Sequence, residues 1–171
     1  MSGGGWWRRN AGGLIALAVL VPASWFALDT IEFGLVRNPV QTVAPGDTVT
    51  VGASRYGPVT LSPLDAGAVG APAQSRPMLV TIPVITEDGK SSCFGAVVTE
   101  SASGRTWRSA SSMLRWEAGE GQQESCSSDP GAKFDLVTPV LLGDDAAGPY
   151  EVVVSVGRES DVLDVRFRVG D

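Results

Sequence analysis

The sequence has no histidine, only two lysines and only two cysteines among its 171 residues. Without histidine, the chain has no Ser-His-Asp or Cys-His catalytic group and no imidazole ligand for a metal. Basic side chains are also scarce, since 13 Lys and Arg face 19 Asp and Glu and the isoelectric point is about 4.6. Because nucleic acids bind to basic surfaces, this balance argues against them as partners. We expect no nucleic-acid partner, metal or cofactor.

Charge is missing entirely from one stretch, residues 10–28, which has the sequence NAGGLIALAVLVPASWFAL. As a helix, a segment of this length spans about 28 Å, close to the roughly 30 Å hydrocarbon core of a bilayer. A helix satisfies its own backbone hydrogen bonds in lipid, where no other partner exists. The stretch therefore predicts a single transmembrane helix over residues 10–28.

The flanks of this stretch predict its orientation. Two arginines precede it, whereas Asp29 and Glu32 follow it. The positive-inside rule then places residues 1–9 in the cytoplasm and the rest of the chain outside. Tryptophan and arginine side chains favour the membrane interfaces. The predicted interface anchors are Trp6, Trp7, Arg8, Arg9 and Trp25.

A cleavable signal peptide is the alternative interpretation of the same stretch. Leu14–Val21 would be its apolar region, and cleavage would follow Ala23. The apolar character continues beyond this point through Trp25 and Phe26, which favours the membrane anchor. Both interpretations export residues 29–171. We expect a juxtamembrane linker and first strand over 29–46, and an extracytoplasmic domain over 47–171.

Export gives the two cysteines, Cys93 and Cys126, an oxidising environment. There, a lone pair of cysteines most simply forms a disulfide, which closes a loop of about 33 residues and contributes about 3–4 kcal/mol on the loop-entropy model. A redox-active or nucleophilic thiol is the alternative. The sequence has no CxxC motif and no histidine to activate a thiolate, so a structural disulfide is favoured. The exported part has 11 basic and 19 acidic residues, a net charge of −8.

Strand-like alternation dominates the exported part. Apolar residues occupy every second position in Tyr150–Val156 and in Val162–Val169, so these segments predict a C-terminal hairpin. The dipeptide Asp88-Gly89 predicts a second hairpin, joining Met78–Thr86 to Ser92–Glu100. Pro83 cannot donate a ladder hydrogen bond, which predicts an edge position or a bulge there.

Weaker patterns complete the predicted domain. Further strands are expected at Thr48–Gly52, Pro58–Leu61, Arg105–Trp107 and Phe134–Leu142. Ala66–Pro77 and Gly119–Gly131 are expected to be loops, and no amphipathic helix is evident after residue 30. Seven to nine short strands separated by turns predict an all-β fold, an immunoglobulin-like antiparallel β-sandwich preceded by the transmembrane helix.

Several short motifs together resemble a family. They are WWRRN before the span, Gly-Asp-Thr-Val at a strand entry, Ser92-Cys93-Phe94, Gly104-Arg105-Thr106-Trp107 and the valine-rich C-terminal hairpin. The chain resembles small actinobacterial single-pass membrane proteins with an immunoglobulin-like extracytoplasmic domain of largely unassigned function. The resemblance implies topology and fold, and it assigns no active residue.

Carboxylates are the most abundant reactive groups. The adjacent pair Asp144-Asp145 offers hard oxygen ligands to Ca²⁺, but a solvated turn is favoured because the spacing is not that of a calcium loop. Neither S-x-x-K nor G-x-S-x-G occurs, so we expect no enzyme and no small-molecule substrate. A carboxylate-dependent envelope enzyme is the alternative.

Arginines stand beside aromatic residues at two places between the cysteines. Such pairs are typical of interface hot spots, although arginine stems also cover aromatic rings for structural reasons. The expected function is non-catalytic: a protein of the cell membrane displays a disulfide-bonded domain to a protein or envelope component. The candidate interaction face is formed by Trp107, Arg108, Arg115 and Trp116.

Overall fold

The computed structural model describes residues 5, 10–11, 18–21, 38–87, 92–93, 95–126, 129–158 and 161–170. The chain divides into two compact units, Met1–Arg37 and Asn38–Asp171. Most of the predicted span at 10–28 lies outside the described residues, as do all five predicted interface anchors: Trp6, Trp7, Arg8, Arg9 and Trp25. Among the described residues, no helix has the length and apolar character needed to cross a membrane.

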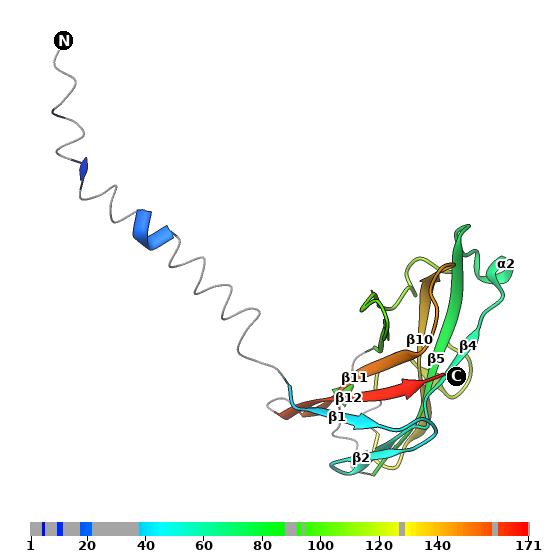
Figure 1. Cartoon of the computed structure of the whole chain (residues 1–171). Coiled ribbons are helices and arrows are strands. Elements are labelled where there is room, and N and C mark those ends of the chain that lie inside the picture. Colours follow the sequence, from blue (N-terminus) through cyan, green and yellow to red (C-terminus); the bar gives the residue numbers. More distant parts are fainter. Residues whose placement is uncertain are drawn as a thin grey trace. The chain divides into compact units, whose positions relative to one another are not determined.

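The second unit is a β-sandwich of two six-stranded sheets (Figure 1). In the first sheet, the order is β1-β12-β11-β7-β8, and β6 also pairs with β11. Its strands are β1 (Val40–Val43), β6 (Ser92–Cys93), β7 (Val97–Glu100), β8 (Thr106–Trp107), β11 (Tyr150–Arg158) and β12 (Asp161–Val169).

In the second sheet, the order is β2-β3-β5-β10-β9, and β4 also pairs with β5. Its strands are β2 (Val49–Val51), β3 (Ser54–Tyr56), β4 (Thr60–Pro63), β5 (Ser75–Thr86), β9 (Gln122–Gln123) and β10 (Lys133–Gly143). The long antiparallel pair of β5 and β10 forms the centre of this sheet.

The predicted C-terminal hairpin is confirmed. Strands β11 and β12 pair antiparallel, with Val152 opposite Phe167 and Val154 opposite Val165. Their alternation places these apolar side chains inward, where each is at most 2% exposed. They pack against inward residues of β5 and β10 in one core cluster. Burying a side chain of this size stabilises the fold by about 1.5–3 kcal/mol.

The predicted hairpin at Asp88-Gly89 is wrong. Strand β5 pairs with β3, β4 and β10 in the second sheet, whereas β6 and β7 pair with β11 in the first sheet. The chain therefore crosses from one sheet to the other between β5 and β6. The turn residues themselves, 88–91, lie outside the described residues.

The predicted edge position of Pro83 is also wrong, because β5 is a central strand. The Pro83 carbonyl accepts a hydrogen bond from the Gly57 N–H at 2.9 Å. On this side, residues 84–86 of β5 pair with β3, and residues 78–81 pair with β4. Pro83 lies in the gap between the two pairings. The ring nitrogen of Pro83 thus faces the gap between two partner strands, where no ladder donor is required.

Two further expectations need correction. Two pairings are parallel, β1 with β12 and β9 with β10, so the sandwich is not purely antiparallel. The segment expected to be a loop at Ala66–Pro77 contains a one-turn helix, α2 (Ala66–Val69), and the start of β5. Asp65 caps α2 by accepting from the Ala68 N–H, and Gly70 ends it in the left-handed conformation.

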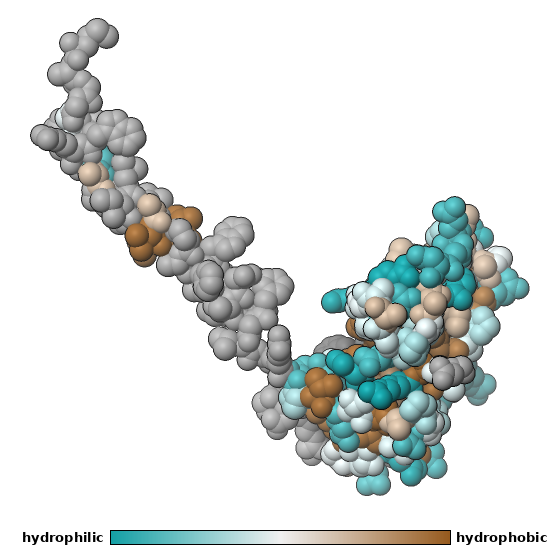
Figure 2. All heavy atoms as spheres, viewed as in Figure 1, coloured by the Kyte–Doolittle hydropathy of each residue, from teal (hydrophilic) through white to brown (hydrophobic). Residues whose placement is uncertain are grey.

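The surface of the domain mixes polar and apolar residues, as Figure 2 shows for one face. Among the described residues of the domain, the large apolar side chains that are well exposed are Val40, on edge strand β1, and Met113, in a loop. In the first unit, Val19, Leu20 and Val21 are 54–65% exposed. Isolated exposed apolar residues are ordinary on a protein surface.

Candidate functional site

The predicted disulfide is confirmed. The Sγ atoms of Cys93 and Cys126 are 1.99 Å apart, and the two Cα atoms are 5.1 Å apart. Cys93 lies on β6 and is buried, whereas Cys126 follows β9 and is half-buried. The bridge therefore fastens the loop after β9 to the first sheet.

The predicted interaction residues pack against two different hydrophobic clusters. Trp107, on edge strand β8, packs against the main core cluster and meets the ring of Tyr150 edge to face, with centroids 6.5 Å apart. The Arg105 guanidinium carbon lies 5.5 Å from the Trp107 ring centroid, a cation–π distance. Arg108 is exposed.

Trp116 belongs to a satellite cluster with Val69, Ala110 and Leu114. The Arg115 N–H donates to the Val69 carbonyl at 2.9 Å, which ties this segment to α2. The Arg115 side chain is exposed and runs past Gly70. That the four residues form one binding face stays a prediction.

A buried carboxylate organises the other polar cluster. Glu100 ends β7 on its inward side and is 3% exposed. It accepts hydrogen bonds from Arg105, from the Ser103 hydroxyl and, at 2.6 Å, from the Ala147 N–H. Arg105 also donates to Asp145 at 2.8 Å. The cluster thus connects the β7–β8 turn to the β10–β11 loop.

Both charges of the Glu100–Arg105 pair are retained near neutral pH. Hydrogen bonds from Arg105, Ser103 and Ala147 lower the pKa of Glu100 from 4.5 to about 2. Hydrogen bonds to Glu100 and Asp145 raise the pKa of Arg105. A group that moves protons in catalysis needs a pKa near the working pH, so this pair is unsuited to acid–base chemistry near neutrality. Its role is structural.

The pair Asp144-Asp145 lies in a turn closed by a hydrogen bond from the Ala146 N–H to the Gly143 carbonyl. The Asp145 carboxylate accepts a hydrogen bond from Arg105, a cation that it shares with Glu100. Across the described part of the chain, no group of three or more His, Cys, Asp or Glu side chains could hold a metal ion.

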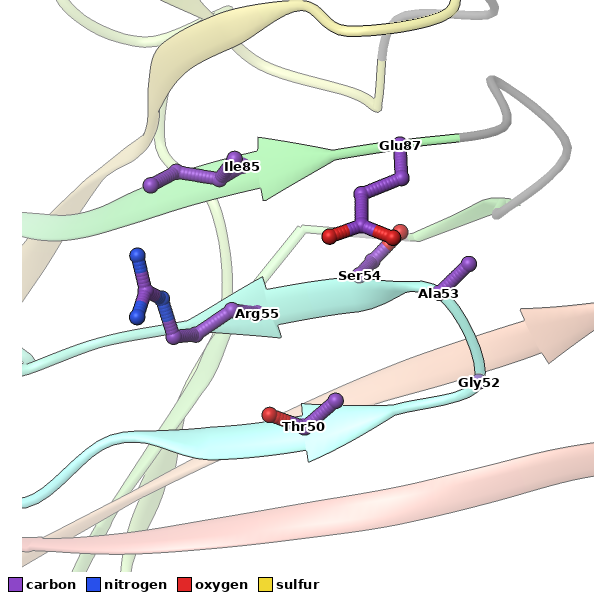
Figure 3. A pocket seen from close by; sticks show the side chains of 7 residues that line it. All are labelled: Thr50, Gly52, Ala53, Ser54, Arg55, Ile85 and Glu87. Carbon is purple, nitrogen blue, oxygen red and sulfur yellow. The ribbon is translucent and has the colours of Figure 1, made fainter.

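A small pocket lies on the outer side of the second sheet, across β2, β3 and β5 (Figure 3). Its volume is about 210 Å³. Figure 3 shows Arg55 and Glu87 toward opposite ends of this pocket, with Thr50 on the neighbouring strand. The lining includes no aromatic side chain: it consists of Thr50, Gly52, Ala53, Ser54, Arg55, Ile85 and Glu87.

A larger pocket of about 350 Å³ lies at one end of the first sheet. We call it the end pocket. It is bounded by the β1–β2 turn, the residue after β7, the start of β11 and the end of β12. Its volume falls in the range of about 300–1,000 Å³ found for small-molecule sites. Its lining residues are Pro45, Ser101, Pro149, Tyr150, Glu151, Arg168 and Gly170.

Sequence reasoning did not find the end pocket. Its residues come from four segments, each 17 to 56 positions from the next along the chain, and none of them forms a recognisable motif. The alternation of β11 and β12 was the available signal, since it predicts that Glu151 and Arg168 point outward on paired strands. Their pairing in register requires the structure.

No family model matches the sequence, and no curated protein matches it significantly. Among solved structures, the chain is similar to the yjhA protein from Bacillus subtilis, with a TM-score of 0.47 and 11% identity over 74% of this chain and 98% of that one. It is also similar to an uncharacterized β-sandwich protein from Clostridium difficile 630, with a TM-score of 0.41 and 8% identity over 77% and 96%. At TM-scores below 0.5, the fold assignment stands on the two sheets of this chain alone.

Proposed function

We propose that the chain is a single-pass membrane protein that displays its β-sandwich outside the cytoplasm to bind a protein or another envelope component. The observation that carries this proposal is a contrast between the two units. The first has an uncharged apolar stretch, and the second is a disulfide-bonded sandwich. Disulfides persist in oxidising compartments, which supports export.

Two observations support the membrane anchor. Residues 10–11 and 18–21, the described residues of the predicted span, are all helical. Three adjacent apolar side chains there, Val19, Leu20 and Val21, are more than half exposed. Insertion into lipid would remove this apolar surface from water.

The immunoglobulin-like type is part of the same proposal. In such folds, a C-F-G sheet packs on an A-B-E-D sheet. The order β7-β11-β12 corresponds to C-F-G, and the central pair of β5 and β10 corresponds to B and E. The disulfide departs from the B–F bridge of antibody domains, because it joins β6 to the segment after β9. An experimental structure with another strand order would contradict this assignment.

Fractionation of native cells tests the anchor. We expect the chain in the membrane fraction, extracted by detergent and not by salt, with its intact N-terminus. The alternative, a secreted domain, requires a mature chain that begins at Ser24, after cleavage behind Ala23. N-terminal sequencing distinguishes the two.

Crosslinking in native membranes followed by pull-down tests the binding role. We expect partners that are lost when Trp107 and Trp116 are replaced by alanine, with the exposed Glu120→Gln as the matched control. If the chain with Trp107 and Trp116 replaced recovers the same partners as the Glu120→Gln control, these tryptophans do not belong to the binding face. The remaining alternative, a carboxylate-dependent enzyme, requires a hydrolase activity that is lost on replacing Asp144 and Asp145.

A further inference from the structure

The end pocket combines three polar groups of different character. Arg168 offers only donors, Glu151 offers only acceptors, and the Ser101 hydroxyl offers both. Glu151 and Arg168 stand directly opposite each other on β11 and β12. The pocket therefore presents a cation, an anion and a hydroxyl within one small volume.

The Glu151 carboxylate is held in place from one side. Arg166 Nη1 lies 3.4 Å from Glu151 Oε2. This ion pair restrains the carboxylate, while Oε1 has no described protein partner. An acceptor oriented in this way loses little side-chain entropy when it binds a ligand.

The apolar part of the end pocket is equally well supported. The Tyr150 ring is held by the edge-to-face contact with Trp107, and its hydroxyl accepts from Arg76 at 3.2 Å. The Ser101 N–H donates to the Pro149 carbonyl at 3.0 Å, which joins two walls of the pocket. Pro149 and Tyr150, which line the pocket beside the polar groups, are therefore held in position.

A pyranose ring has matching chemistry. Its faces are apolar C–H surfaces, and each hydroxyl at its rim both donates and accepts hydrogen bonds. A donor and an acceptor side by side suit adjacent hydroxyls, and the opposite charges of Arg168 and Glu151 suit an uncharged ligand. We propose that the end pocket binds a pyranose unit of a glycan chain. This inference rests on the proposed binding role, but it is independent of the membrane anchor.

Titration of the ¹⁵N-labelled full chain with trisaccharides tests this proposal. The protein is kept in dodecylphosphocholine micelles, whose headgroup contains no sugar. Cellotriose and chitotriose are the two probes, which separate plain from N-acetylated glycans. We expect at least one of them to cause saturable shifts of the amide signals of Ser101, Glu151 and Gly170.

Two substitutions and one control give the test its specificity. Arg168→Gln and Ser101→Ala should each weaken binding, by about tenfold for Arg168, as expected for the loss of a hydrogen bond from a charged group. The matched control is Arg55→Gln, an exposed arginine that lines the small pocket on the other sheet. It should bind like the original chain.

The proposal is overturned by the absence of saturable shifts with both probes, or by unchanged binding in Arg168→Gln. It is also overturned if N-acetyl-alanyl-alanine shifts the same amides and the sugars do not, because the ligand would then be a carboxylate. Partner recovery by crosslinking is measured separately. Failure of the titration with recovered partners would reject the sugar and leave the binding role standing.

Discussion

The carboxylate of Glu100 shows how one residue fastens two loops. It is almost fully buried, yet three donors compensate the loss of water. Because its folded-state pKa is about 2 and its ordinary value is 4.5, protonation disfavours the folded state. The stabilisation is complete above about pH 4.5 and is lost as the pH falls toward about 2.

Replacement of Glu100 by glutamine tests this account. We expect Glu100→Gln to lower the thermal midpoint by several degrees at pH 7, because Arg105 loses its charged partner. The decline of stability between about pH 4.5 and 2 should be shallower in this variant. Thermal unfolding across this pH range measures both effects. In the control Glu120→Gln, an exposed carboxylate, the original pH profile should be retained.

The disulfide is the basis of a second prediction, which concerns the stability of the fold. Replacing both Cys93 and Cys126 by serine should lower the free energy of unfolding by about 3–4 kcal/mol, because the unfolded chain is no longer closed into a loop. Urea denaturation measures the change. Reducing the unmodified protein with dithiothreitol should have a similar effect, and an unchanged midpoint after confirmed reduction would contradict the prediction.

The disulfide was predictable because two cysteines in a chain that is predicted to be exported leave one pairing. The cluster around Glu100 was not predictable. Arg105 is five positions from Glu100 and Asp145 is 40 positions from Arg105, so no local pattern connects them. Only the folding of the β10–β11 loop onto the β7–β8 turn brings these groups together.

Strands with long alternation were predictable as elements. Strands β11 and β12 each bury one face, so their apolar period is visible in the sequence. Strand β3 has three residues and β9 has two, which is too short for a period to be recognised. Strands β3 and β9 form because they pair with the longer strands β5 and β10, and a sequence pattern does not reveal such pairing.

The error at Asp88-Gly89 has a different cause. A turn dipeptide specifies a local reversal, and it does not specify which partner the next strand will have. In this chain, the inward residues of β5 and β7 lie on opposite sides of one core, so the strands pack face to face across it. Pro83 was misplaced for a similar reason, because the gap between β3 and β4 cannot be inferred from β5 alone.

The satellite cluster should open separately from the main core. Leu114→Ala removes a buried side chain that packs between α2 and the segment from Ala110 to Trp116. We expect the free energy of local opening to fall by about 2 kcal/mol. Hydrogen exchange should become faster at Ala110, Leu114 and Arg115. The amides of β5 and β10 should keep their protection. Faster exchange throughout both sheets would show that the cluster is part of the global folding unit.

As a whole, the β-sandwich should fold without the first unit. A chain that starts at Asn38 keeps both sheets and the disulfide, because all their described pairings lie within residues 38–171. We expect its thermal midpoint to lie within about 4 °C of that of the full chain, a difference of about 1 kcal/mol or less. Circular dichroism melting measures this. A much lower midpoint would show that the first unit contributes to folding.

The edge strand β1 has a mechanical consequence. It runs parallel to β12, with Val40–Val43 opposite Asp164–Phe167. The start of β1 and the end of β12 therefore lie at opposite ends of their ladder. A pull that separates Asn38 from Gly170 along the strands loads the β1–β12 hydrogen bonds in shear, so that they share the force and do not open one after another like a zipper.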